Sequence, residues 1–218
     1  MCLSSLLLLG SVVATEQMFA VEQAYFKPNC EGDLYRVEAT PAGLCRESFN
    51  KKGSTITNCV DGKVVTEMCT DQKCQEGCKP LPHDPNICSS DSFSSSKHVC
   101  TSDIKAETFF GEGAGYVSSS FYNGDEPMCF YEDLRDVVMR PTNKCIPFAS
   151  GSAWERYTCK EGVFVKESFF EEGCDNGKEP YETIEHTTDN CKRSLYDETV
   201  HDVCQPPSPQ SQKGHQEL

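Results

Sequence analysis

The chain has 218 residues, fifteen cysteines and a formal charge of −14. So acidic a chain argues against binding to nucleic acid or to anionic membranes, because both kinds of partner attract clustered Lys and Arg side chains. The acidic residues are scattered along the sequence, so we expect them to form a solvated surface. The charge therefore excludes classes of partner without identifying one.

We expect residues 1–14 to be a signal peptide. Leu3 to Val13 contains neither charge nor proline, and it is shorter than the ~20 apolar residues that a membrane span needs. Small residues favour cleavage near Ala14, and Ala20 offers a second possible site. No later segment is apolar enough to span a membrane. The sequence therefore predicts a secreted chain without a membrane span.

An internal repeat is the most informative feature of the sequence. Six cysteines recur in the same order 99 to 104 residues later, and Cys59-Val-Asp-Gly62 matches Cys159-Lys-Glu-Gly162. This register predicts a duplication, with repeat 1 over 15–104 and repeat 2 over 105–205. The repeated cysteines are Cys30, Cys45, Cys59, Cys74, Cys88 and Cys100, followed by Cys129, Cys145, Cys159, Cys174, Cys191 and Cys204.

Loss of Cys2 with the signal peptide leaves an even fourteen cysteines, eight in repeat 1 and six in repeat 2. In an exported chain such a density predicts a disulfide framework, and we expect no metal and no cofactor. The two additional cysteines of repeat 1 are Cys69 and Cys78, where the same offset gives Phe169 and Lys178 in repeat 2. If the shared cysteines keep the same bridges in both repeats, Cys69 must pair with Cys78. The remaining connectivity stays open.

The local pattern favours short β-strands. Asp61-Gly62 and Glu161-Gly162 are turn signals between pairs of β-rich runs, which predicts a hairpin in each repeat. Residues 132–139 are the candidate for one short helix. In chain order we expect strands over 23–26, 55–58, 62–67, 116–122, 155–158 and 162–167.

Each repeat is small enough that an apolar core alone would be marginal, so we expect the disulfides to supply much of its stability. The predicted fold is small, disulfide-rich and mostly β, with two tandem homologous domains. After Cys204 the composition turns to Pro, Ser and Gln, which predicts a disordered polar tail over 206–218.

A search for catalytic motifs returns none. The five histidines form no His-x-x-x-His pair, and no serine occupies a Gly-x-Ser-x-Gly elbow. An even number of cysteines leaves no free thiol to act as a nucleophile. We therefore expect a protein that is not an enzyme.

Aromatic side chains are the candidate ligand-binding residues. Trp154 is the only tryptophan, and its counterpart in repeat 1 is Ser54, so the shared core does not require it. Sugar rings pack on aromatic faces, and we expect Trp154 to bind a sugar, with Tyr157 sharing its face in an extended segment. Tyr122 and Tyr131 are further candidates. The alternative is that Trp154 belongs to the core.

The layout of a signal peptide followed by two adjacent cysteine-rich domains resembles the Leo-type lectins of the amoeba cyst wall. The resemblance covers roughly residues 25–205 and rests on architecture and cysteine count, with six cysteines instead of eight in repeat 2. It implies a non-catalytic protein that binds cellulose or related wall glycans through exposed aromatic residues. Tandem copies would raise the avidity for a repetitive polymer.

We therefore expect a secreted lectin that recognises a wall or extracellular polysaccharide. The alternative is an extracellular protein-binding module such as a protease inhibitor, for which the segment between Cys69 and Cys78 is a candidate loop. A third interpretation is a lumenal protein of the endoplasmic reticulum. It depends on His215-Gln216-Glu217-Leu218, which is similar to a retrieval signal.

Overall fold

The structure is a computed structural model of the chain. It describes residues 16–47, 52–81, 84–90, 94–123, 129–130, 133–148, 153–170, 173–174, 179–188, 190–193 and 199–208. The predictions for the signal peptide, Tyr131 and the terminal tetrapeptide 215–218 lie outside these residues. No helix of the described part is long and apolar enough to cross a membrane.

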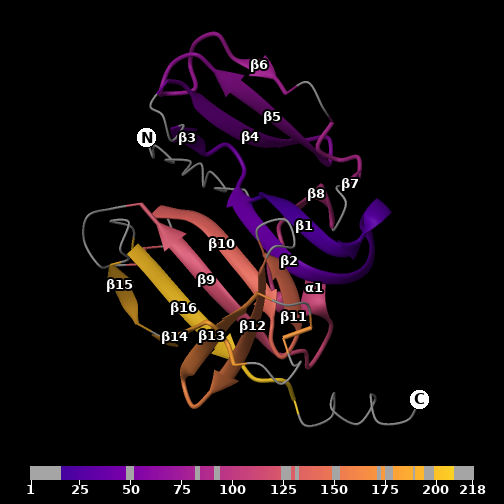
Figure 1. Ribbon diagram of the computed structural model, residues 1–218. Helices are drawn as coiled ribbons and strands as arrows, with labels where there is room; N and C mark the ends of the chain where they lie inside the picture. The colour runs from indigo at the N-terminus through magenta and orange to yellow at the C-terminus, as the bar shows by residue number, and fades with distance from the viewer. Residues whose placement is uncertain are drawn as a thin grey trace, which may run out of the picture.

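The fold is mostly β, and both repeats contribute to one antiparallel sheet of eight strands (Figure 1). Each repeat supplies four adjacent strands, so the boundary between the repeats runs through the middle of the sheet. Across the sheet the order is β15 (Cys191–Arg193), β16 (Thr199–Gln205), β9 (Tyr116–Tyr122), β10 (Leu134–Pro141), β2 (Glu31–Pro41), β1 (Phe19–Lys27), β8 (Ser95–Thr101) and β7 (Ser89–Ser90).

Each repeat also has a four-stranded antiparallel sheet of its own. Repeat 1 forms it from β3 (Cys45–Glu47), β4 (Ser54–Val60), β5 (Lys63–Cys69) and β6 (Lys79–Pro80). Repeat 2 forms it from β11 (Cys145–Phe148), β12 (Ala153–Lys160), β13 (Val163–Phe169) and β14 (Glu182–Thr187). Figure 1 shows the small sheet of repeat 1 at the top of the molecule and that of repeat 2 lower, in front of the large sheet.

Two short helical elements complete the described fold. They are the 3-10 turn η1 (Pro28–Cys30) and the helix α1 (Ala106–Phe110). The turn follows β1, and the helix lies in the segment that links the last strand of repeat 1 to the first strand of repeat 2.

The predicted hairpins are confirmed in both repeats. Asp61 and Gly62 join β4 to β5 with φ angles of 50° and 76°, and Glu161 and Gly162 join β12 to β13 with 50° and 78°. Positive φ at both central residues is the requirement of a type I′ turn, whose twist matches that of the paired strands. The turn residues therefore fix the register of each hairpin.

The short helix predicted over residues 132–139 is wrong, because residues 134–141 form β10. This strand pairs with β9 on one side and with β2 on the other. Backbone pairing on both edges, together with burial of Val137 and Met139, outweighs the weak helical pattern of the segment.

The two repeats join through the pairing of β2 with β10. Val37 lies opposite Met139, Glu38 opposite Val138 and Ala39 opposite Val137. The repeats are therefore parts of one continuous sheet, and a separate domain on each side of residue 104 stays a prediction.

Two apolar clusters lie on opposite faces of the large sheet. Tyr116 and Val117 are neighbours in β9, so their side chains point to different faces, and each belongs to a different cluster. The first cluster covers the junction of the repeats and consists of Phe19, Val21, Val37, Ala39, Ala106, Leu134, Val137 and Met139. The second lies between the large sheet and the small sheet of repeat 2 and consists of Val117, Ile146, Tyr157 and Phe164.

The disulfide pattern is the same in both repeats. Numbering the shared cysteines 1 to 6, the pairs are 1 with 5, 2 with 4 and 3 with 6. Repeat 1 has Cys30–Cys88, Cys45–Cys74 and Cys59–Cys100, and repeat 2 has Cys129–Cys191, Cys145–Cys174 and Cys159–Cys204. The additional pair is Cys69–Cys78, as the comparison of the repeats predicts.

Residues 206–208, which begin the predicted tail, belong to the described part. The backbone N–H of Ser208 donates to the carbonyl oxygen of Gly113 at 2.9 Å. The start of the tail is therefore held against the segment that links the repeats, and residues 209–218 lie outside the description.

Candidate functional site

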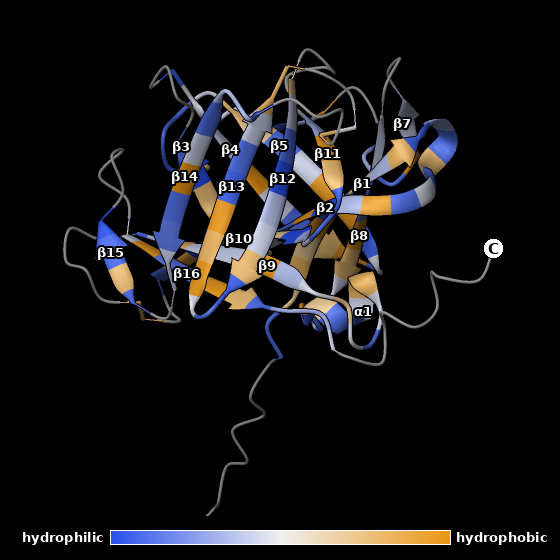
Figure 2. Ribbon diagram, turned by 60° about the horizontal axis from the view of Figure 1, so that its bottom comes forward, coloured by the Kyte–Doolittle hydropathy of each residue, from blue (hydrophilic) through white to orange (hydrophobic). Residues whose placement is uncertain are grey.

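Trp154 lies in β12. It pairs with Pro147 of β11 on one side and with Phe169 of β13 on the other. Its side chain is half-buried and points to the same face as that of Arg156, away from the second apolar cluster. Figure 2 shows β12, β13 and β14 side by side in front of the large sheet, and this outward face is where a ligand could approach.

The prediction that Tyr157 shares a ligand-binding face with Trp154 is wrong. The two residues are three positions apart in a strand, so their side chains point to opposite faces. Tyr157 belongs to the second cluster, is only 5% exposed, and donates its hydroxyl to Glu155 Oε2 at 2.7 Å. Burial raises the pKa of the Tyr157 phenol, and the nearby Arg140 guanidinium opposes that shift. Tyr157 is therefore a core residue.

Tyr122 lies at the end of β9, where its ring packs against the first apolar cluster. It is on the large sheet, whereas Trp154 is on the small sheet of repeat 2. Tyr131 lies outside the described residues. The structure therefore does not bring the predicted aromatic residues together into one surface.

The sequence analysis missed the most exposed aromatic pair of the described residues. Phe170 is 73% exposed and Tyr181 is 47% exposed, and their rings stack with centroids 4.0 Å apart at an interplanar angle of 18°. Phe170 directly follows β13, and the backbone N–H of Tyr181 donates to the carbonyl of Ser168 at 2.9 Å. The pair thus lies beside Phe169, the residue opposite Trp154.

A signal for this pair exists in the sequence. Phe169 and Phe170 are adjacent, and neighbouring residues of a strand point to opposite faces. Phe169 is buried under the guanidinium of Arg156, whose Cζ lies 5.4 Å from the ring centroid. Phe169 takes the place beneath Arg156, so Phe170 has no such cover and is exposed.

One member of the aromatic pair, Tyr181, occupies the place of a disulfide cysteine of repeat 1. Met68 pairs with Lys79, and Ser168 pairs with Glu182. The residues one step further along the two hairpins are Cys69 and Cys78 in repeat 1 and Phe169 and Tyr181 in repeat 2. The sequence offset, by contrast, aligns Cys78 with Lys178. Phe170 therefore stacks on Tyr181 at a hairpin end that repeat 1 closes with a covalent bond, and the equivalent positions of repeat 1 are Thr70 and Cys78.

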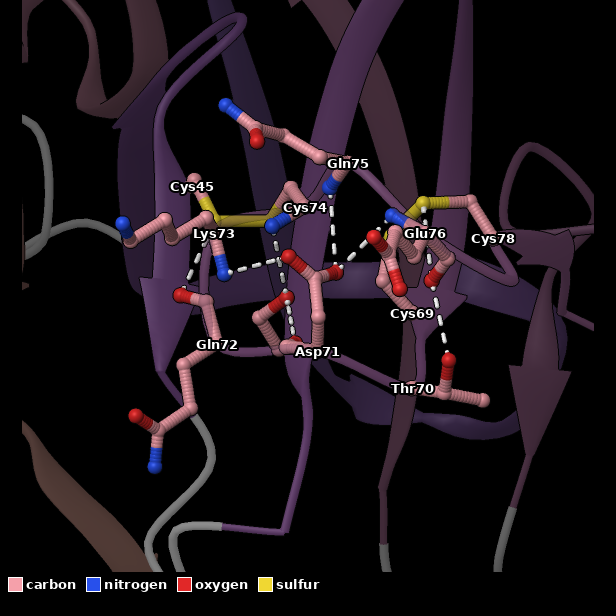
Figure 3. Close-up of a disulfide and its surroundings, with 11 residues drawn as sticks. Cys45, Cys69, Thr70, Asp71, Gln72, Lys73, Cys74, Gln75, Glu76 and Cys78 are labelled. Atoms are coloured by element: carbon pink, nitrogen blue, oxygen red, sulfur yellow. Dashed lines mark hydrogen bonds between the residues drawn. A yellow bond between two sulfur atoms is a disulfide. The ribbon is translucent and has the colours of Figure 1, made fainter.

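A second exposed feature is the loop of residues 70–77, which we call the stapled loop (Figure 3). Cys69–Cys78 closes its two ends, and Cys45–Cys74 anchors its middle to β3. The carboxylate of Asp71 accepts the backbone N–H groups of Lys73, Gln75 and Glu76, each at 3.0 Å. These bonds, that from Glu76 above all, hold the pKa of Asp71 below its usual value.

Buried charges lie between the large sheet and the small sheet of repeat 2. Glu155 pairs with Lys166 at 2.6 Å, and Asp202 pairs with Lys192 at 2.6 Å. The ring of His186 stacks on Phe164 with centroids 4.4 Å apart, and burial lowers the pKa of His186 although Asp202 opposes the shift. Each buried carboxylate is neutralised by a lysine, so these charged residues belong to the core.

Among the described residues, no three His, Cys, Asp or Glu side chains are arranged to hold a metal ion. No protein-family model matches the chain, no curated protein matches it, and no solved structure matches it. Any function must therefore be argued from the surface of this molecule.

Proposed function

We propose that this chain is an exported, non-enzymatic protein that binds a wall or extracellular polysaccharide through exposed aromatic side chains. The observation that carries the proposal is the stacked pair of Phe170 and Tyr181. Aromatic rings bury a large apolar area on binding, and a rigid ring offers a flat face to the apolar face of a pyranose. The resemblance to Leo-type lectins supports the same class of ligand.

Two features make this pair suited to a polymer. The two rings stack at the end of the hairpin formed by β13 and β14 and are more exposed than Trp154, so a polymer chain can reach both of them. The stack also restricts the rotation of both rings before a ligand arrives, which lowers the entropic cost of binding. The net charge of −14 favours a neutral polymer over an acidic one.

The site lies in repeat 2 alone. Thr70 and Cys78 stand in repeat 1 where Phe170 and Tyr181 stand in repeat 2, and Cys78 is bonded to Cys69. Repeat 1 therefore has no counterpart of this aromatic pair at the equivalent positions, which does not favour the expectation that two equivalent copies raise the avidity. In the proposed function, repeat 2 binds the polymer.

The experiment is depletion of the oxidatively folded protein from solution by insoluble cellulose or chitin. We expect Phe170→Ala to abolish most of the retention and Trp154→Ala to weaken it. Ile87→Ala is the matched control, because Ile87 is also an exposed apolar residue, at 66%, but lies in repeat 1. No retention of the wild-type protein on either polymer, or equal retention of all variants, would refute the proposal.

A second candidate function is recognition of a protein by the stapled loop. Gln75 and Glu76 are exposed on a segment whose ends and middle are covalently fixed, so little conformational entropy is lost on binding. Asp71 already accepts the N–H groups of Lys73, Gln75 and Glu76, so this backbone cannot pair with a partner strand. Recognition would instead use the side chains.

The inhibitor form of this candidate is tested with a panel of serine, cysteine and metallo-proteases. Stoichiometric inhibition of one protease, lost in a variant with Gln75→Ala and Glu76→Ala, would support it. Lys160→Ala is the control, since Lys160 is exposed in β12 of the other repeat. If every protease of the panel kept its full activity, the inhibitor function would be rejected and the polysaccharide proposal would remain.

A further inference from the structure

A cleft of about 790 Å³ lies where the two repeats meet. Its walls come from β1 and β2 of repeat 1, from α1 and the segment after it, and from the turn between β10 and β11. Sites for small molecules usually have volumes of about 300–1,000 Å³ and often lie between structural units. The cleft is remote in sequence from Phe170 and Tyr181, neither of which lines it, so it is a separate candidate site.

Aromatic rings form part of the wall. Tyr25, Phe109 and Phe110 line the cleft, and all three are half-buried. Phe109 and Phe110 also pack against the first apolar cluster, which fixes their position. The Tyr25 hydroxyl donates to Gln23 Oε1 at 2.8 Å, and the Nζ of Lys97 lies 5.5 Å from the ring centroid. The rings are therefore held in place while part of their surface faces the cleft.

The polar groups of the wall suit an uncharged ligand. Asp33 and Lys144, which belong to different repeats, form an ion pair of 2.7 Å and largely neutralise each other. Glu112 adds one negative charge, which disfavours an anionic ligand. The side-chain amides of Gln23 and Asn143 offer both hydrogen-bond donors and acceptors, as ligand hydroxyl groups require.

Backbone hydrogen bonds tie the rim of the cleft together. The N–H of Asn143 donates to the carbonyl of Tyr157 at 2.8 Å, and the N–H of Thr142 donates to that of Gly115 at 3.0 Å. The turn between β10 and β11 is thus joined to β12 and to the linking segment. A preformed site of this kind pays less ordering entropy when a ligand binds.

We propose that this cleft binds a neutral oligosaccharide. A sugar ring has apolar faces and carries hydroxyl groups around its edge. The wall of the cleft offers aromatic rings for the faces, and amides and a neutralised ion pair for the hydroxyl groups. The proposal uses none of the residues of the aromatic pair, so the two sites can succeed or fail separately. It also gives the duplication a role, because residues of both repeats are needed to form the walls.

The test is isothermal titration calorimetry of the full chain with cellohexaose and chitohexaose. We expect one site per chain for at least one of them, weakened at least tenfold by Phe109→Ala and at least threefold by Asn143→Gly. Asn143 has a φ of 58°, so glycine there removes the amide without straining the turn. Near-UV circular dichroism checks that each variant is folded.

Phe170→Ala is the matched control for the calorimetry, because it truncates an aromatic ring outside the cleft. We expect it to bind the hexasaccharide normally while losing retention on the polymer, and Asn143→Gly to do the reverse. Hexagalacturonate serves as the charged probe, and we expect no heat from it. Absence of binding by both neutral probes, binding unchanged in Asn143→Gly and Phe109→Ala, or tighter binding of hexagalacturonate would each overturn the proposal.

Discussion

Glu38 of β2 and Val138 of β10 lie opposite each other at the junction of the repeats, although they occupy equivalent positions in the two copies. They are 100 residues apart, the same offset as Cys45 and Cys145. The junction is therefore centred on a local two-fold relation, as in a symmetric dimer. Pairing of β2 with β10 also removes two open strand edges from the surface.

An ion pair across this junction, with a buried carboxylate and a half-buried guanidinium, should contribute to stability. Asp136 of β10 pairs with Arg46 of repeat 1 and also accepts a hydrogen bond of 3.0 Å from Thr40. The Asp136 side chain is only 9% exposed and Arg135 contacts it as well, so Asp136→Asn removes a buried negative charge that two guanidinium groups neutralise. We expect the free energy of unfolding to fall by about 3 kcal/mol, measured by urea denaturation.

The matched control for Asp136→Asn is Asp33→Asn. Asp33 pairs with Lys144, and this pair also joins the two repeats, but the Asp33 side chain is 71% exposed. Exposed ion pairs contribute about 0–1 kcal/mol, so this variant should unfold at nearly the wild-type urea concentration. If both variants lost the same free energy of unfolding, burial of Asp136 would not be the reason that its ion pair stabilises the junction.

The additional disulfide of repeat 1 should stabilise the fold less than the bridge that joins the two sheets. Cys69 and Cys78 are separated by 9 residues, and Cys59 and Cys100 by 41. From loop entropy, alanine at both cysteines should cost about 2.6 kcal/mol for the first pair and about 3.9 kcal/mol for the second. Thermal unfolding of the two double variants measures which loss of stability is larger. A larger loss for Cys69–Cys78 would show that loop length does not decide the stabilisation.

Tyr157→Phe separates a core role from a binding role. The substitution removes a hydrogen bond to the buried Glu155 carboxylate, and bonds to charged groups contribute about 1.5–3 kcal/mol. We expect a loss of about 2 kcal/mol in chemical denaturation with no change in retention on cellulose or chitin. Tyr181→Phe is the control, since its exposed hydroxyl should leave stability within about 0.5 kcal/mol of wild type. Reduced polymer retention in Tyr157→Phe would restore it as a ligand-binding residue.

Stability should fall on mild acidification because of His186. Burial lowers its pKa, so below about pH 6.5 the unfolded chain takes up a proton that the folded chain does not. The free energy of unfolding is therefore highest above that pH and decreases as the pH falls toward the pKa of the folded protein. His186→Phe keeps a ring on Phe164 and should flatten this part of the pH profile. Urea denaturation at a series of pH values measures it, and an unchanged slope would contradict the assignment.

The candidate site was only partly predictable from the sequence. Trp154 was singled out because it has no aromatic counterpart in repeat 1, and it does lie on an outward face. Tyr157 was placed on the wrong face because three residues in a strand lead to the opposite side. Phe170 and Tyr181 were missed because eleven positions separate them in the chain, and only the hairpin between β13 and β14 brings their rings together.

What the sequence by itself determined is local or repeated. The offset of the cysteines defined the duplication and the pair Cys69–Cys78, and Asp61-Gly62 and Glu161-Gly162 defined two hairpins through the backbone conformation that such turns require. The tertiary structure alone decided that residues 134–141 form a strand, that the repeats share one sheet, and which rings are exposed. These properties depend on partners far away in the chain, because a strand gains its stability from the edges it pairs with and a side chain its burial from the sheet that covers it.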